Sequence, residues 1–249
     1  MSGRNISAKF SEDRKILTVS CINKASTELG VDFEKLISAL QKFLDECFTP
    51  AWGIPVKLVT AKEKKAWNLT LFDDAADAAT EGYHEFTFNA FPHSRVFVHE
   101  ILANGQKVSV RTCHELAEMI VDPAINLWSS RSGKELCAYE ICDPVEEEEF
   151  LIDGIAMSDF VFPAYFEPFH RDKSVQFDFL GKVDKPFQIL KGGYCILREG
   201  NNVFHSFGSE AKKRRFEKET KRMKRSNYRY QSDGRVRISK GPVRKRISA

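Results

Sequence analysis

Apolar positions in the first half of the chain alternate between strand-like and helix-like spacing. Residues 8–25 predict a strand centred on Ile16–Ser20, and Asp32 is a good N-cap for the helix that follows. That helix carries apolar residues at helical spacing, namely Phe33, Leu36, Ile37, Leu40, Phe43, Leu44 and Cys47, and we expect Pro50 and Gly53 to end it. The ranges 56–60, 67–72 and 85–89 predict short strands. The range 95–101 predicts a clearer one with exposed polar positions, an edge strand, before a helix in 108–122 that Pro123 stops.

The second half is richer in aromatic residues and turns. Residues 150–170 carry many Phe, Tyr and Pro, which favours core packing or an assembly surface over the lining of a substrate pocket. Residues 187–207 predict a β-hairpin with glycine turns, and residues 212–225 predict a charged helix. We therefore predict an α+β protein with three parts: a domain over 1–150, an aromatic-rich β subdomain over 151–210, and a basic tail over 211–249.

The net charge of +3 conceals an uneven distribution. Residues 211–249 hold 16 Lys and Arg against three acidic residues, so the rest of the chain carries a net charge of −10. The run Glu146–Glu149 is interpreted as a solvated loop. The two ends of the chain are therefore expected to meet different partners.

The helix in 108–122 carries the strongest chemical signal. Its residues His114, Glu115, Glu118 and Asp122 share the face opposite an apolar stripe of Leu116, Met119 and Ile120. His114 and Glu118 are four residues apart, which lets both bind one metal ion, and Glu115 would then lie beside the bound water as general base. The alternative is an ordinary acidic helix face exposed to solvent.

Residues farther along the chain complete the predicted site. Glu140 is the expected third ligand, Asp143 an outer-shell acceptor for the imidazole of His114, and Asp122 a second residue of that outer shell. The other histidines, including His84 and His99, are interpreted as ordinary surface or core residues. A metal shared by Cys137 and Cys142 is not favoured, because structural zinc pairs usually lie closer in sequence.

The motif His114-Glu115-x-x-Glu118 resembles the His-Glu-x-x-His helix of the zincin metallopeptidases. The order of elements before it, and a glutamate about twenty residues after it, are similar to the gluzincin arrangement. The resemblance covers residues 8–143. It implies a zincin-like fold, a zinc ion, a peptide substrate and an edge strand that pairs with it. Uncharacterised bacterial and phage proteins with a similar motif helix and a Tyr-Glu-x-Cys-Asp segment are a second resemblance.

Glu118 departs from that motif, because the family has histidine there. A carboxylate in this place makes the site harder, so Mn²⁺, Mg²⁺ and Ca²⁺ compete with Zn²⁺. Two functions follow as hypotheses. The chain is a metal-dependent peptidase or a degenerate relative of one, or it is a non-catalytic zincin-fold structural protein of a phage particle that contacts virion subunits.

The basic tail points to a polyanion. The expected contact residues are Lys212, Lys213, Arg214, Arg215, Lys221, Arg222, Lys224 and Arg225, which would bind nucleic acid or an acidic protein surface, including the protein's own body. No apolar run is long enough for a membrane span, and no signal-like stretch opens the chain. We therefore expect a cytoplasmic protein with no membrane partner, or a virion protein if a phage encodes it.

Overall fold

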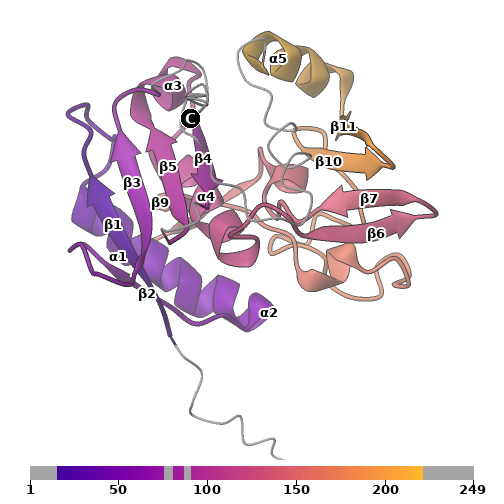
Figure 1. Ribbon diagram of the computed structural model, residues 1–249, viewed down its shortest axis with the longest axis horizontal. Helices are drawn as coiled ribbons and strands as arrows, with labels where there is room; N and C mark the ends of the chain where they lie inside the picture. Colours follow the sequence, from indigo (N-terminus) through magenta and orange to yellow (C-terminus); the bar gives the residue numbers. More distant parts are fainter. Residues whose placement is uncertain (1–15, 76–80, 87–90, 221–249) are drawn as a thin grey trace, which may run out of the picture.

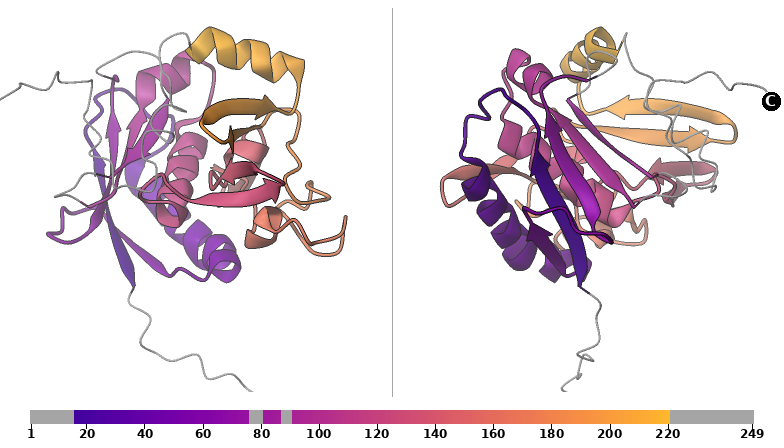
Figure 2. Two further views of the ribbon diagram at one scale, coloured as in Figure 1. Left: turned by 45° about the vertical axis from the view of Figure 1, so that its right-hand side comes forward. Right: turned by 60° about the vertical axis from the view of Figure 1, so that its left-hand side comes forward.

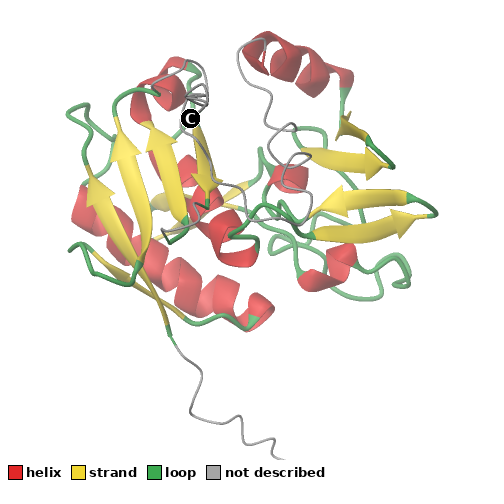
Figure 3. Ribbon diagram, viewed as in Figure 1, coloured by secondary structure: helices red, strands yellow, loops and turns green. Residues whose placement is uncertain are grey.

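The computed structural model describes residues 16–75, 81–86 and 91–220. The chain forms a mixed α+β fold, as predicted, with two separate sheets on either side of a central helix (Figures 1 and 3). The larger sheet has the order β2-β1-β3-β5-β4. Its strands are β1 (Leu17–Asn23), β2 (Val56–Val59), β3 (Trp67–Phe72), β4 (Gly82–Glu85) and β5 (His93–Phe97). Only β4 runs antiparallel to its neighbour.

One long helical segment connects β1 to β2. Helix α1 (Phe33–Phe43) begins where expected, because the Asp32 carboxylate accepts a hydrogen bond from Lys35 N at 3.0 Å. The segment continues through a π-helical turn (Leu44–Phe48) into α2 (Thr49–Trp52), so Pro50 does not end it. Pro50 lies in the first turn of α2, where a missing N–H is tolerated, and Gly53 ends the segment in a left-handed conformation with φ 70°.

The predicted edge strand 95–101 is wrong in its bounds and its position. Strand β5 ends at Phe97, and Val98–Ala103 forms helix α3, so His99 is helical. The backbone N–H of His99 donates to Asp73 O at 3.0 Å, which fixes the start of that helix on the turn after β3. β5 lies between β3 and β4, so β4 forms this edge of the sheet.

Helix α4 (Val108–Val121) contains the motif and lies at the centre of the molecule (Figure 1). It packs on β4 and β5 on one side, and on the hairpin of β8 (Glu149–Ile152) and β9 (Ile155–Ser158) on another. One hydrophobic core extends from Val19 to Leu197. The segments 1–150 and 151–210 therefore share a core.

The second sheet is antiparallel and lies to the right of α4 in Figure 1. Its order is β11-β10-β7-β6, and its strands are β6 (Trp128–Ser132), β7 (Glu135–Ala138), β10 (Tyr194–Glu199) and β11 (Asn202–Phe207). The predicted hairpin in 187–207 is β10–β11. The predicted charged helix is α5 (Glu210–Thr220), which packs beside β11 (Figure 2). Among the described residues, no helix has the length and apolarity that crossing a membrane requires.

Candidate metal centre

The motif helix is buried on nearly every side. His114 is 1% exposed, and Glu115 and Glu118 are fully buried. The alternative of a solvated acidic face is therefore wrong. The predicted polar face is covered by β4 and by the segment that follows β7, so its carboxylates and imidazole pack against other polar side chains and not against water.

His114 lies between two carboxylates. Its Nε2 atom is 3.2 Å from Oε1 of Glu118 and 3.3 Å from Oδ1 of Asp143. Neither contact has the geometry of a hydrogen bond, and Nε2 is left without one. Two ligands of a tetrahedral zinc ion, each about 2.1 Å from the metal, lie about 3.4 Å apart. The three atoms are therefore spaced like ligands of one ion.

Cys142 adds a thiol to this side of the helix. Its backbone N–H donates to Oε1 of Glu118 at 3.3 Å. His114, Glu118 and Cys142 each offer a ligand atom, and these atoms all lie within 4.8 Å of one another. Burial holds the pKa of the Cys142 thiol well above its ordinary value, so a metal would have to displace its proton.

A second group forms on the β4 side of the helix. His84 and Glu115 join Glu118 there, again with ligand atoms within 4.8 Å of one another. Glu115 lies so close to β4 that a Cβ on Gly82 would be 2.7 Å from its Cγ. Glycine is therefore required at position 82 for this close approach.

The remaining predicted residues surround the two groups. Glu140 is buried, and its charge helps to raise the pKa of Glu118, yet among the described residues it belongs to neither group. Its role as the third ligand stays a prediction. The Asp122 carboxylate accepts hydrogen bonds from Asn126 N at 3.0 Å and Leu127 N at 3.1 Å, and its backbone carbonyl accepts one from His84 Nε2 at 3.0 Å.

The electrostatics of the cluster favour bound protons when no cation is present. Burial, together with Asp143 and Glu140, raises the pKa of Glu118 to about 8. Burial lowers the pKa of His114, but the charge of Glu118 outweighs this and raises it to about 10. The cluster therefore holds protons at neutral pH that a metal cation would displace.

A second buried network occupies the other end of the same helix. Arg111 Nη2 lies 2.6 Å from Glu81 Oε2 and 2.9 Å from Glu146 Oε1. Glu146 also pairs with Lys212 of α5. Burial opposes the charge of Glu146, but Arg111 and Lys212 outweigh it and lower the pKa of Glu146 to about 2. Helix α5 is thus attached to the motif helix through Glu146.

Two expectations about charged runs need correction here. The run Glu146–Glu149 is not simply a solvated loop, because Glu146 is largely covered and ion-paired in this network, Glu147 pairs with Arg215 and Glu149 begins β8. Lys212 is 5% exposed and ion-paired, so it is not free to contact nucleic acid, whereas Lys213 and Arg214 are exposed. Lys221, Arg222, Lys224 and Arg225 lie outside the described residues.

Sequence reasoning missed His84 and underrated Cys142. Gly82 and His84 point to the same face of β4 because strand side chains alternate, so the pattern Gly-x-His was a usable signal. The strand predicted over 85–89 lies instead at Gly82–Glu85, so Gly82 and His84 fell outside the predicted strand. Cys142 was weighed only as a partner of Cys137, whereas its structural neighbours are His114 and Glu118.

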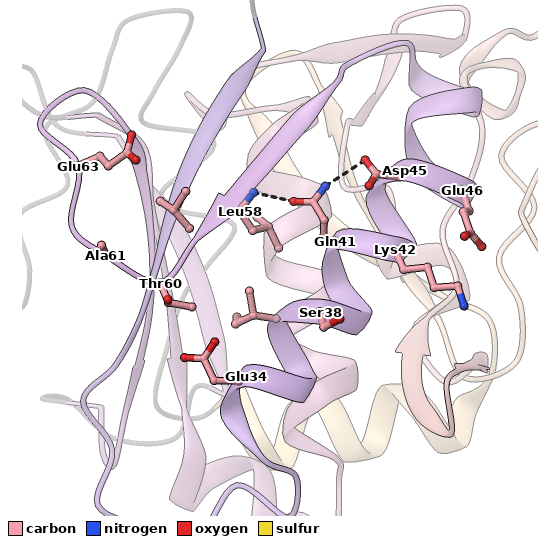
Figure 4. Close-up of a pocket in the computed structure, with 12 residues that line it drawn as sticks. Glu34, Ser38, Gln41, Lys42, Asp45, Glu46, Leu58, Thr60, Ala61 and Glu63 are labelled. Carbon is pink, nitrogen blue, oxygen red and sulfur yellow. Dashed lines mark hydrogen bonds between the residues drawn. The ribbon is translucent and has the colours of Figure 1, made fainter.

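The surface offers a groove elsewhere. It lies between α1 and β2, where Gln41 accepts a hydrogen bond from Leu58 N at 2.7 Å and donates one to Asp45 Oδ1 at 3.0 Å (Figure 4). Glu34, Glu46 and Glu63 also line it, but no residue of the metal cluster does. The groove therefore gives no access to His114.

No protein-family model, curated protein or solved structure matches this chain. The cluster must therefore be interpreted from its own geometry.

Proposed function

We propose that this chain is a zincin-related metal-binding protein whose ion lies between His114, Glu118 and the segment Cys142–Asp143. One observation carries the proposal. His114 Nε2 is buried, has no hydrogen bond, and lies 3.2 and 3.3 Å from carboxylate oxygens of Glu118 and Asp143. A buried imidazole nitrogen that has ion contacts but no hydrogen bond is poorly satisfied, and a metal ion would satisfy it together with both carboxylates.

The burial of the ligands favours a structural ion over a catalytic one. Structural sites are closed by protein ligands, whereas catalytic sites keep a position open for water and substrate. Here His114, Glu118 and Cys142 are at most 1% exposed. The ion would join α4 to the segment after β7, which are remote in sequence. This supports a degenerate relative of the peptidases, suited to a structural role such as that of a virion protein.

The metal depends on which ligand completes the set. With Asp143 the site has one nitrogen and two carboxylates, which suits Mn²⁺ as well as Zn²⁺. With Cys142 the soft thiolate selects Zn²⁺. Substitution with Co²⁺ separates these two cases, because a cysteine ligand gives a sulfur-to-cobalt charge-transfer band that Cys142→Ser removes.

Metal analysis tests the proposal directly. Full-length protein is purified without chelator, and Zn and Mn are quantified in wild type, His114→Ala and the matched control His99→Ala, which removes an exposed histidine on α3. We expect a bound ion in wild type and in the control, and its loss in His114→Ala. Equal metal content in all three proteins would refute the ligand assignment.

A second candidate function is metal-dependent peptide hydrolysis. The position of β4 favours it, because an antiparallel edge strand beside the motif helix is where a peptide would add to the sheet. Glu115 would act as general base. Glu115→Gln should then abolish hydrolysis of an unfolded protein such as casein while the ion near His114 is retained. Lack of hydrolysis by metal-loaded wild type would exclude this function and leave the structural one.

A further inference from the structure

Two potential ligand groups share Glu118. One contains His114, Glu118 and Cys142, and the other contains His84, Glu115 and Glu118. We propose that the cluster binds two divalent cations, bridged by the Glu118 carboxylate, with His84 and Glu115 as ligands of the second ion. This rests on the first ion of the proposed function and adds a second binding position.

The two oxygens of Glu118 have different surroundings. Oε1 lies 3.2 Å from His114 Nε2 and accepts the backbone N–H of Cys142 at 3.3 Å. Oε2 is buried and has no hydrogen-bond partner among the described residues. A buried carboxylate oxygen without a hydrogen bond is costly to the fold. A second cation on the His84 side would satisfy Oε2 while Oε1 stays with the first.

His84 is oriented as a metal ligand. Its Nε2 lies 3.0 Å from the backbone carbonyl of Asp122, and a carbonyl only accepts, so Nε2 carries the proton. The lone pair of the neutral ring is then on Nδ1. That atom is buried and without a hydrogen bond in the described part of the chain. Metal-binding histidines are commonly held this way, with the other ring nitrogen donating to a backbone carbonyl.

Glu115 completes the second position. It is fully buried, and the bare backbone at Gly82 gives its side chain room beside β4. His84 reaches into the cluster from the same strand, two residues farther on. Strand β4 and helix α4 thus supply one nitrogen and two carboxylates to a single point. Two metal ions about 3.5–4 Å apart are the usual spacing in two-metal sites, and a bridging carboxylate fits that span.

The number of acidic residues in the cluster also favours cation binding. Glu115, Glu118, Glu140 and Asp143 bring four buried carboxyl groups to this region. This concentration of buried negative charge favours binding of divalent cations. Carboxylates with two imidazoles form a donor set that both Zn²⁺ and Mn²⁺ accept.

The number of ions per chain tests the inference. Full-length apoprotein is titrated with ZnCl₂ and, separately, with MnCl₂, and bound metal is quantified after gel filtration. We expect two ions per wild-type chain, one in His84→Gln, and fewer than one in Glu118→Gln, because the bridge serves both positions. His93→Gln is the matched control, since His93 lies on the neighbouring strand β5 and bonds only Thr70 among the contacts described.

A spectroscopic readout on wild type does not depend on the folding of any variant. Two Mn²⁺ ions bridged by a carboxylate give an exchange-coupled electron paramagnetic resonance spectrum, whereas a single ion gives an isolated hyperfine pattern. We expect coupling in wild type and the isolated pattern in His84→Gln.

The possible failures are distinguishable. One ion per wild-type chain that is lost in His114→Ala, with an uncoupled Mn²⁺ spectrum and no effect of His84→Gln, would overturn the second position and leave the proposed function intact. No bound metal in wild type would overturn both.

Discussion

Helix α4 takes part in two buried polar clusters that are neutralised in different ways. Near its first turns, Arg111 lies between Glu81 and Glu146, and Lys212 pairs with Glu146, so two cations face two anions. One turn later, His114 and Glu118 meet Asp143, and His84 and Glu115 lie on the other side. In the first cluster protein cations face the carboxylates, and Arg111 Nε lacks a hydrogen bond, whereas the second keeps three metal-ligand atoms without one, at His114 Nε2, Glu118 Oε2 and His84 Nδ1.

The difference between these two clusters indicates which of them needs a metal ion. Burial alone does not mark a site, because Arg111 and Lys212 of the first cluster are also buried. What separates them is the source of the positive charge: Arg111 and Lys212 face the carboxylates of the first cluster, whereas the second cluster gathers metal-ligand atoms of His114, Glu118 and His84 that lack hydrogen bonds. A network of matched ion pairs holds the fold, and a cluster of metal-ligand atoms without hydrogen bonds points to an ion.

The largest expected effect is that of metal removal. Incubation with EDTA should lower the melting temperature of wild type strongly, since structural zinc ions contribute on the order of 10 kcal/mol in small domains. Differential scanning calorimetry with and without chelator measures it. Glu118→Gln should melt at the temperature of the chelated wild type and show little further change with EDTA. An unchanged melting temperature of the wild type would remove the distinction between the two clusters.

The second largest effect on stability is expected from breaking the ion pairs of Arg111 with Glu81 and Glu146. Arg111→Met leaves Glu81 and Glu146 without their shared guanidinium, and loss of one partner from a buried ion pair costs about 3–5 kcal/mol. Urea unfolding of metal-loaded protein measures the loss. The bound metal per chain should not change, because Arg111 offers no ligand atom. Loss of metal in a folded Arg111→Met protein would show that the two clusters are a single unit.

The buried carboxyl groups of Asp159 and Asp178 form a third case, in which a bound proton removes one of the two negative charges. Burial and the neighbouring Asp178 raise the pKa of Asp159 to about 8 from its ordinary 3.8. The folded protein therefore binds a proton between about pH 4 and pH 8 that the unfolded chain releases, so stability falls as the pH rises through this window. The slope is about 1.4 kcal/mol per pH unit, or about 3 kcal/mol between pH 5 and pH 7.

Asp159→Asn should remove this slope. The amide keeps the acceptor that Phe160 N and Leu180 N use, at 2.8 and 3.3 Å, and it can donate to Asp178 at every pH. Urea unfolding of wild type and variant at both pH values measures the difference. An equally steep slope in the variant would show that Asp159 is ionised in the folded protein.

Local signals in the sequence predicted part of this picture and missed the rest. Asp32 and the apolar spacing after it predicted α1, and the motif spacing predicted that His114 and Glu118 would meet, because i and i+4 are neighbours on any helix. Asp143 was expected beside His114 as an outer-shell acceptor, from the chemistry that a metal-binding histidine needs. Lys212 pairs with the protein's own body, one of the partners expected for the basic residues, but neither this pair nor the neighbours of His84 could be located from the sequence, since β4 and α5 reach α4 through tertiary packing that no local pattern encodes.

The smallest effect concerns the basic residues of α5, where the same contrast between satisfied and available charges applies. Lys212 is buried with Glu146, and Phe216 packs against Tyr194, His205 and Phe207, so one face of α5 is docked. Lys213 and Arg214 are exposed and available to a polyanion.

Each phosphate contact adds about 0.9 to the slope of log affinity against log salt. The double variant Lys213→Ala, Arg214→Ala should therefore lower the slope by up to about 2 in a salt series with duplex DNA. The matched control Lys212→Met should leave it unchanged, because this charge already serves Glu146. An equal loss in the control would mean that α5 leaves the body when DNA binds, and an unaltered slope in the double variant would place any DNA contact outside this helix.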